Sequence, residues 1–308
     1  MAHAPKHGRS LRCQLDRPWW AGSARALLVL LVWPATSCDG SVEPVDTTLE
    51  RIQQSGVVRI AYANEAPYGY RDIESGRVTG EAPEIARVIL RRLGVEKLEA
   101  SLVDFGQLIP GLQAGRYDMI AAGMYITPER CQQIDFSNPT YAVGEAFLVR
   151  AGNPRHLHSF EDALQRGRLG VVGGTVEFQY AEKLGMPTTR LVVFPDNATA
   201  LAGLRNDRID AFAGTALTVR YLLDVAGVED IEVAEPFEQP RLQEARPRSH
   251  GAFGFREQDD AFREAVNAEL ARFIGTQEHL ALTKQFSFTR DELPGDVTAE
   301  DICGRGNL

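Results

Sequence analysis

Tryptophan is confined to the beginning of this chain. All three tryptophans, Trp19, Trp20 and Trp33, fall within the first forty residues, a segment that also has the features of a removable export signal. If that segment is cleaved, an aromatic binding site in the remaining chain can contain only tyrosine and phenylalanine rings.

A hydrophobic run long enough to cross a membrane is lacking as well. The apolar run at 26–33 is far shorter than the roughly 20 residues that a transmembrane helix needs. Basic residues precede it and small residues follow it as far as Cys38, which is the pattern of an export signal. We therefore predict a signal peptide over residues 1–38. The residues before Cys38 resemble a bacterial lipoprotein box, so two outcomes stay open: lipidation of Cys38, or plain cleavage nearby.

Cysteine is scarce, with four in the chain. Cys13 is lost with the signal and Cys38 is either lost with it or lipidated, which leaves Cys131 and Cys303 as the thiols of the exported protein. In an oxidising compartment we expect these two thiols to pair, which would attach the C-terminal tail to the first half of the chain. The alternative of two unpaired thiols stays open.

The chain is also poor in positive charge. Its 33 Lys and Arg residues are outnumbered by 42 Asp and Glu residues, which gives a formal net charge of −9. Loss of residues 1–38 removes five basic residues and one acidic residue and leaves about −13. This balance argues against nucleic acid as a partner.

Constellations typical of catalysis or metal binding are likewise missing from the sequence pattern. We find no Ser-His-Asp or Cys-His set, no glycine-rich phosphate loop and no group of metal ligands at a characteristic spacing. His156 and His158 are two residues apart and are interpreted as surface residues. We therefore expect no enzyme activity, no cofactor and no metal.

What the sequence does contain is a regular alternation of short apolar runs and helical patterns, over a length of 308 residues that suits two hydrophobic cores. Strands alternating with helices predict two α/β lobes with parallel sheets covered on both faces. The first series has strands at 57–63, 98–104 and 117–123, and helices at 80–94, 106–115 and from Thr127 onward. The second has strands at 168–174, 190–196 and 209–214, and helices at 176–185, 197–208 and 217–227.

Two extended segments, 141–154 and 251–256, join the two series and are predicted to act as a hinge. A last amphipathic helix at 259–275 returns to one lobe. The predicted organisation is a first lobe at 45–148, a second lobe at 149–250, and a return to the first lobe with a C-terminal tail at 251–308.

One helix start has the composition of a carboxylate receptor. Thr127 is a good N-cap, Pro128 suits the first helical position, and Arg130 falls in the first turn. Backbone N–H groups and a guanidinium therefore meet at one place, which favours an anionic ligand group. The alternative is an ordinary capped helix with a solvated arginine.

The same region carries a family resemblance, which extends over residues 48–288. The chain resembles the type 3 family of periplasmic solute-binding proteins, which serve ABC importers of polar amino acids and related zwitterions. Within that family it is most similar to the ectoine-binding subfamily. The motifs are LIPGLQAGRYDMIAAGMYITPER and DFSNPTY for the family, and ANEAPYGY, GEAPEIA, TPERC and GTALTV for the subfamily. The resemblance implies a venus-flytrap fold, in which two α/β lobes joined by two hinge strands close on one ligand.

The resemblance also implies a carboxylate-binding end of the site. Arg130 occupies the position of the arginine that holds the ligand carboxylate, with Thr127 at the start of its helix. Thr175, in GGTVE, matches a threonine at the start of the first helix of the second lobe, where a Gly-Gly turn exposes N–H groups to an anion. Read alone, that turn could equally be a tight strand-to-helix connection. Asn197 and Thr215 are further candidates on the second lobe.

Thr215 marks a departure from the family pattern. Amino-acid binders of this family usually carry a second aspartate there, which pairs with the ligand's α-ammonium group. Here the run is DAFAGT, with Asp210 present and Thr215 in place of the second acid. An ordinary amino acid would lose its main counter-charge, so the pattern disfavours one as the ligand.

The positive end of the ligand must then be bound by the first lobe. Tyr68, Phe105 and Tyr125 fall on the three aromatic cage positions of the ectoine-binding subfamily, and each follows a predicted strand. A cation against a ring face gains about 0.5 to 2 kcal/mol per contact. Glu65 adds a negative charge that can accept N–H hydrogen bonds. The alternative places these rings in the core or on the surface.

The expected function is therefore capture of a small zwitterion, ectoine or hydroxyectoine, for ABC permease subunits. We expect a monomer outside the cytoplasm, with membrane contact only through a lipid anchor at Cys38 if one is attached. Two alternatives stay open: a binder of a polar amino acid or a betaine-like solute, and a periplasmic dehydratase acting on a cyclohexadienyl acid, an activity that a few proteins of this fold have.

Overall fold

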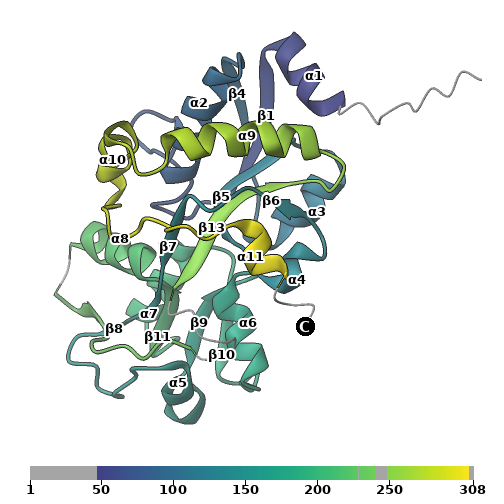
Figure 1. The fold of residues 1–308 in the computed structure, drawn as a ribbon. Helices are drawn as coiled ribbons and strands as arrows, with labels where there is room; N and C mark the ends of the chain where they lie inside the picture. Colours follow the sequence, from purple (N-terminus) through teal and green to yellow (C-terminus); the bar gives the residue numbers. More distant parts are fainter. Residues whose placement is uncertain (1–46, 228, 241–247, 305–308) are drawn as a thin grey trace, which may run out of the picture. The chain divides into compact units, whose positions relative to one another are not determined.

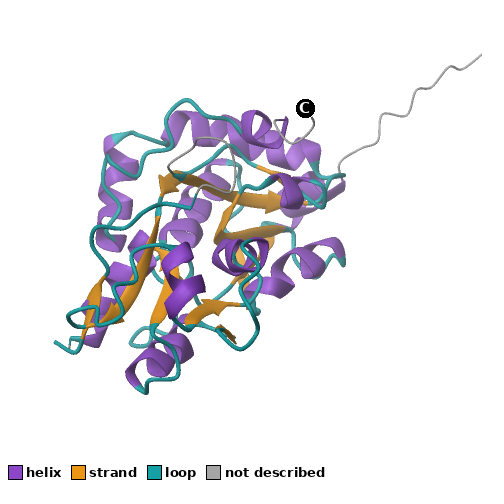
Figure 2. Ribbon diagram, turned by 90° about the horizontal axis from the view of Figure 1, so that it is seen from below, coloured by secondary structure: helices purple, strands orange, loops and turns teal. Residues whose placement is uncertain are grey.

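The computed structural model describes residues 47–227, 229–240 and 248–304. The predicted signal peptide, and Cys38 with it, lie outside these residues. The described chain forms two lobes, each built on one β-sheet with helices packed against it, as the sequence predicted (Figure 1). Figure 2 shows helices on either side of the strands.

The first lobe begins with alternating helices and strands. Its elements are α1 (Thr47–Ser55), β1 (Val57–Tyr62), β2 (Tyr70–Arg71), β3 (Val78–Thr79), α2 (Glu81–Arg92), β4 (Lys97–Leu102), η1 (Phe105–Gln107), α3 (Leu108–Gln113), β5 (Met119–Tyr125), α4 (Pro128–Cys131), β6 (Asp135–Phe136) and β7 (Tyr141–Val143). Helix α2 forms where expected because Ile85 and Ile89 supply a buried stripe and Pro83 lies in the first turn.

The second lobe repeats the rhythm, and the chain then returns to the first sheet. The second lobe comprises β8 (Glu145–Arg150), α5 (Phe160–Arg166), β9 (Leu169–Val172), α6 (Val176–Lys183), β10 (Leu191–Phe194), α7 (Asn197–Arg205), β11 (Ala211–Thr215), α8 (Ala216–Ala226) and β12 (Ile231–Val233). The return comprises β13 (Ser249–Phe255), α9 (Asp260–Phe273), α10 (Gln277–Thr283), η2 (Lys284–Phe286) and α11 (Ala299–Cys303).

The two large sheets are mixed, where the sequence predicted parallel ones, and β2 and β3 form a separate two-stranded sheet. Their strand orders are β4-β1-β5-β13-β6, with β7 also pairing β13, and β10-β9-β11-β8-β12. The strands of the βαβ units pair in parallel, but β13 is antiparallel to β5 and β8 is antiparallel to β11. The reversed strands are the ones that arrive from the other lobe, so they enter each sheet from the opposite end.

The first crossing between the sheets lies at Gly144. Strand β7 pairs with β13 in the first sheet and ends at Val143, whereas β8 pairs with β11 in the second sheet from Glu145 onward. The division between the sheets therefore falls before residue 145 rather than between residues 148 and 149. Gln239 holds the backbone next to the crossing. Its side chain accepts a hydrogen bond from the Glu145 N–H at 2.8 Å and donates one to the Glu145 carbonyl at 2.9 Å.

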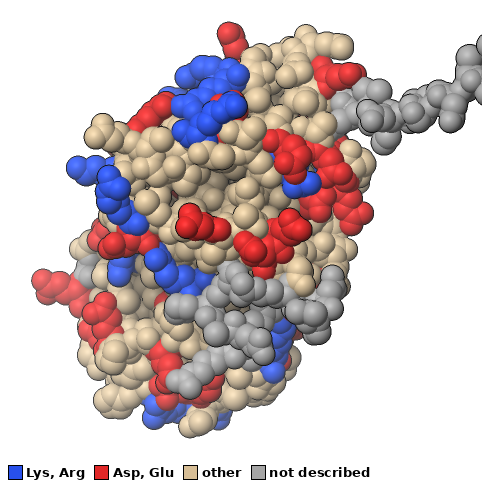
Figure 3. All heavy atoms as spheres, viewed as in Figure 1, with Lys and Arg blue, Asp and Glu red and all other residues tan. Residues whose placement is uncertain are grey.

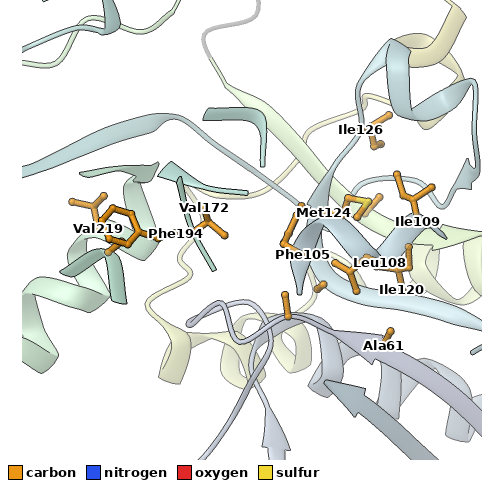
Figure 4. Packing of buried hydrophobic residues seen from close by; sticks show 14 of the residues in the cluster. Ala61, Phe105, Leu108, Ile109, Ile120, Met124, Ile126, Val172, Phe194 and Val219 are labelled. Atoms are coloured by element: carbon orange, nitrogen blue, oxygen red, sulfur yellow. The ribbon is translucent and has the colours of Figure 1, made fainter. Parts of the chain in front are cut away.

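Apolar packing fills each lobe and also runs between them. A first-lobe cluster includes Ile60, Ile85 and Phe262, and a second-lobe cluster includes Phe147 and Phe160. A further cluster contains residues of both lobes, and Figure 4 shows Phe105 between first-lobe side chains such as Met124 and second-lobe side chains such as Val172. The lobes therefore share buried apolar surface beside the site described below.

A disulfide joins Cys131 to Cys303, with Cα atoms 5.7 Å apart and 172 residues between them in sequence. It attaches α11 to α4, directly after Arg130. No helix within the described residues has the length and apolar character to span a bilayer. On the face drawn in Figure 3, acidic and basic side chains are interspersed.

Candidate functional site

Two cavities meet at Glu65, where the strand ends of the two lobes face each other. The outer cavity, of about 330 Å³, is lined by first-lobe residues including Phe105 and by second-lobe residues including Asp196. The inner cavity, of about 10 Å³, has room for about one water molecule. The inner cavity is lined by Glu65, Val172, Thr175, Glu177, Asn197, Phe212, Ala213, Gly214, Thr215 and Thr218. Three of the sequence-predicted site residues on the second lobe therefore line one cavity with Glu65.

Arg130 is buried beside these cavities, with 3% of its surface exposed. Its guanidinium donates to the Tyr125 carbonyl at 2.7 Å and, across the lobes, to the Gly174 carbonyl at 3.0 Å. The guanidinium carbon lies 5.5 Å from the centre of the Phe105 ring. Burial lowers the pKa of Arg130 and the nearby Glu177 opposes that shift, and a guanidinium remains charged in proteins. Two of its five N–H donors are used in these hydrogen bonds.

Helix α4, which Thr127 caps, is much shorter than a helix whose N-terminus binds an anion. Helix α4 has four residues, and the Thr127 hydroxyl caps it by accepting the Arg130 N–H at 3.3 Å. A single turn has little aligned dipole, so an anion here would be held by the Arg130 guanidinium rather than by the helix.

Three second-lobe polar residues stand at helix starts that face the inner cavity. The Thr175 hydroxyl caps α6 and donates to the Val172 carbonyl at 3.0 Å. The Thr215 hydroxyl caps α8 and accepts a hydrogen bond from the Tyr68 hydroxyl at 2.8 Å, which crosses between the lobes. Asn197 is the first residue of α7 and 5% exposed, and its side-chain Nδ2 has no hydrogen-bond partner among the described residues.

The predicted aromatic cage is only partly assembled as one cluster. Tyr68 and Tyr125 both pack against Tyr141, with ring centres 4.9 Å and 6.1 Å apart, and Phe288 lies edge-on to Tyr68 at 5.7 Å. Phe105 belongs to a different apolar cluster and faces Arg130 instead. Burial raises the pKa of the Tyr68 and Tyr125 hydroxyls well above its ordinary value, so both rings are neutral.

Glu65 is part of a group of buried acids. Its pKa is raised to about 8, chiefly by burial and also by the neighbouring Glu177, while Arg130 opposes the shift. Glu145 is 3% exposed, and burial together with the adjacent Glu177 carboxyl raises its pKa well above the ordinary value. Glu81 is fully buried in the first lobe, and burial raises its pKa to about 8.

The acids Glu145 and Glu177, and the ring of Tyr141, were not among the residues predicted from sequence. The two acids had a signal in the sequence, however. Glu145 interrupts the apolar run YAVGEAFLVR, and a charge inside a buried strand is costly unless it is paired and hydrogen-bonded, so an acid there indicates a partner. Glu177 stands two residues after Thr175 in the GGTVE motif. What the sequence lacked was the pairing that brings them together.

The lobes contact each other directly at several points around the site. Besides the hydrogen bonds made by Tyr68 and Arg130, Lys183 of the second lobe forms an ion pair with Glu129 of the first at 2.7 Å. Gly174 lies against Gly106 so closely that a Cβ at residue 174 would be 2.6 Å from the Gly106 Cα. This is a closed arrangement of the two lobes.

Other polar residues singled out from the sequence lie elsewhere. Asp210 pairs with Arg168 at 3.0 Å, which ties down the start of β11 rather than binding a ligand. The His158 ring contacts the Pro236 carbonyl at 2.9 Å, and His156 is exposed. Within the described ranges, no group of three or more His, Cys, Asp or Glu side chains is arranged to hold a metal ion.

In comparison with known proteins, the chain is similar to an ABC transporter binding protein and, at lower identity, to an enzyme. It is 36% identical over 261 residues to a probable amino-acid ABC transporter periplasmic-binding protein, y4tE, of Sinorhizobium fredii, covering 83% of this chain and 86% of the relative. It is also 27% identical over 201 residues to the cyclohexadienyl dehydratase of Pseudomonas aeruginosa, covering 64% of this chain and 74% of that enzyme.

Solved structures give the same picture. The structure of EhuB in complex with hydroxyectoine matches with a TM-score of 0.76 and 34% identity, covering 84% of this chain and 98% of EhuB. An ancestral arginine-binding protein bound to arginine matches with a TM-score of 0.66 and 25% identity, covering 75% and 98%. The model of the bacterial extracellular solute-binding proteins, family 3, matches residues 58–289. With its two-lobed fold and the site between its lobes, the chain belongs to family 3 of the bacterial extracellular solute-binding proteins.

Proposed function

We propose that this protein captures ectoine or hydroxyectoine between its lobes and delivers the solute to ABC permease subunits. The observation that carries the proposal is the placement of a buried guanidinium and a buried acid at one site. Buried Arg130 and the acid Glu65 lie close enough for their charges to interact, between the lobes of the fold. A small molecule with a carboxylate and a delocalised cation matches that pair. The similarity to EhuB, solved with hydroxyectoine, supports the same class of ligand.

The carboxylate end of the ligand is assigned to Arg130 and the second-lobe helix starts. A carboxylate that accepts two guanidinium N–H groups gains about 1.5 to 3 kcal/mol per charged hydrogen bond. In our proposal Thr127 holds the turn that carries Arg130, and Thr175 and Asn197 contact the carboxylate from the second lobe. The Asn197 Nδ2 group has no other described partner, which suits a donor to the ligand.

The cationic end is assigned to Glu65 and to the rings of Tyr68, Phe105 and Tyr125, with Thr215 beside Tyr68. The inner cavity is smaller than any such ligand, so the Tyr68–Thr215 and Arg130–Gly174 contacts must separate to admit it. A ligand bound to both lobes replaces these contacts by its own and so favours the closed arrangement.

Titration calorimetry on the exported chain tests the proposal. We expect tight binding of ectoine or hydroxyectoine, and weaker binding of glycine betaine, glutamine and arginine. Arg130→Ala should lower affinity for the bound carboxylate about 100-fold or more, since two charged hydrogen bonds are lost. Arg130→Lys is the matched control, because it keeps the positive charge but not the planar guanidinium. Its affinity should lie between those of the wild type and Arg130→Ala. Tight binding of glutamine or arginine without binding of ectoine would refute the assigned ligand.

A second candidate function, dehydration of a cyclohexadienyl acid, is favoured by one observation. Glu65 lines both cavities and burial raises its pKa to about 8, so it holds a proton at neutral pH and could act as a general acid. Purified protein incubated with a cyclohexadienyl acid decides the matter by the absorbance of an aromatic product. Turnover that is lost in Glu65→Gln would establish the enzyme, and absence of turnover would eliminate it.

The proposal includes an exported monomer that is held at the membrane through Cys38. Mass measurement of protein extracted from membranes tests the anchor, since lipidation of Cys38 adds a lipid mass to a chain that starts at that residue. An unmodified chain recovered from the soluble extracytoplasmic fraction would refute the tether. Light scattering of the purified chain tests the monomer.

A further inference from the structure

The first residue of β8 brings an acid to the side of the inner cavity. Glu145 is directly opposite Thr215 in the antiparallel pairing of β8 with β11. Opposed residues on antiparallel strands project to the same face of the sheet, with Cβ atoms about 4.5 to 5.5 Å apart. Thr215 lines the inner cavity. The Glu145 carboxyl therefore lies on the cavity side of the second sheet, next to Thr215.

A second acid meets it from α6. Glu177 lines the inner cavity and its carboxyl contacts that of Glu145. Neither oxygen of Glu145 accepts a hydrogen bond from an N–H or O–H group of the described chain, although the side chain is almost fully buried. A buried acceptor without a donor costs about 1 to 3 kcal/mol, and more if it is charged. Such a pair is stable only with a shared proton or with a donor from outside the protein.

Other buried polar atoms around the same cavity also lack partners. Asn197 and Thr218 both line it, and neither the Asn197 Nδ2 atom nor the Thr218 Oγ1 atom is hydrogen-bonded within the described chain. These residues come from α7 and α8, whereas the two acids come from β8 and α6. Three elements, β8, α7 and α8, thus contribute unsatisfied polar groups beside one small cavity, and α6 adds the Glu177 carboxyl. Such a concentration is the property of a ligand subsite rather than of a packed core.

We propose that Glu145 and Glu177 form a second cation-binding subsite, which accepts hydrogen bonds from N–H groups at the positive end of the ligand. The inference rests on the proposed function and narrows the chemical class of its ligand. The ligand is a small carboxylate whose cationic end carries at least two N–H donors, such as a cyclic amidinium or a primary ammonium group. A quaternary ammonium compound has no N–H donor, so it leaves both carboxyls without a partner.

The charge count agrees with this class. Arg130 is the buried cation beside the cavities, and a ligand carboxylate neutralises it. Glu65, Glu145 and Glu177 then face the cationic end of the ligand from both lobes, and a bound cation favours the charged form of each acid. A cation that donates several hydrogen bonds can satisfy acids on more than one side, whereas a cation bound by ring faces alone satisfies none of them.

Calorimetry with three probes tests the subsite: ectoine, arginine and glycine betaine. We expect wild-type protein to bind an N–H-bearing probe at least 10-fold more tightly than glycine betaine. Glu145→Gln and Glu177→Gln should each weaken binding of that probe about 10- to 100-fold, the range for a charged hydrogen bond, with less than a threefold effect on glycine betaine. Each variant tests the subsite by itself if the other fails to fold. Glu81→Gln is the matched control, since it replaces the carboxyl of another buried glutamate, at the start of α2 in the first lobe, and should leave affinity unchanged.

The outcomes separate the two proposals. If ectoine binds but both cavity variants keep wild-type affinity, the subsite is wrong and the proposed function stands. If arginine binds in place of ectoine and both variants weaken it, the subsite stands and ectoine is the wrong ligand. If glycine betaine binds as tightly as either N–H-bearing probe, or if none of the three binds, the subsite is overturned.

Discussion

Closure of the lobes should depend on the absence of a side chain at Gly174. A methyl group there would be 2.6 Å from the Cα and 2.9 Å from the N of Gly106 on the opposite lobe, distances that real Cβ atoms essentially never show. Both obstructing atoms belong to backbone, so they cannot rotate away. We expect overpacking of about 1 to 3 kcal/mol in the closed arrangement, and therefore a loss of ligand affinity of about 5- to 150-fold in Gly174→Ala.

Gly174 also has a positive φ of 82°, so alanine adds backbone strain of about 1 to 2 kcal/mol in both open and closed forms. Gly185→Ala isolates that strain, because φ there is 73° and nothing lies within 4 Å of a new Cβ. Gly106→Ala adds a methyl group on the other side of the same contact without a clash, because its Cβ would lie at an ordinary 3.6 Å from the Gly173 carbonyl oxygen.

Calorimetry with the bound probe measures affinity, and thermal unfolding measures strain. Gly174→Ala and Gly185→Ala should lower the thermal midpoint by similar amounts, about 2 to 8 °C. Only Gly174→Ala should lose affinity, and Gly106→Ala should resemble wild type in both assays. Wild-type affinity in Gly174→Ala, or an equal affinity loss in Gly185→Ala, would show that the glycine contact does not govern closure.

Two further predictions concern stability without ligand. Burial raises the pKa of Glu65 and Glu81 from 4.5 to about 8 and that of Glu145 well above 4.5, so the folded state binds more protons than the unfolded chain. The free energy of unfolding should therefore be largest near pH 4.5 and fall as pH rises toward 8; thermal midpoints that rise over this range would contradict the buried acids. Replacing Cys131 and Cys303 by serine should lower the free energy of unfolding by about 2 to 5 kcal/mol, measured by denaturant titration against the oxidised wild type, and an unchanged midpoint would show that the bond does not constrain the unfolded chain.

The elements that the sequence predicts well are those set by nearby residues. Helix α2 follows from the spacing of Ile85 and Ile89, and the helical turn at Arg130 follows from the Thr-Pro start. The sequence did not predict that this turn would end after four residues. Parallel pairing within each βαβ unit is also local in origin, because a crossover helix imposes it. The antiparallel strands were missed because their direction is decided by a chain that crosses from the other lobe.

The same distinction applies to the candidate site. Thr175 and Thr215 stand at helix starts, which motifs reveal, and the structure places both at the inner cavity. The contact of Glu145 with Glu177 depends on the register that sets Glu145 opposite Thr215, and a shift of one residue would turn Glu145 to the other face. Register between strands 70 residues apart in sequence cannot be read from either segment alone.

Gly144 gives the hinge and the site a common element. The residues on either side of it belong to different sheets: Val143 ends a strand of the first sheet and Glu145 begins a strand of the second. Any rotation of the backbone at this position turns the Glu145 carboxyl relative to the tyrosine rings at the same time as it moves the lobes. Opening the lobes therefore also separates the groups that bind the cation. Variants selected for faster opening and closing should change ligand preference as well.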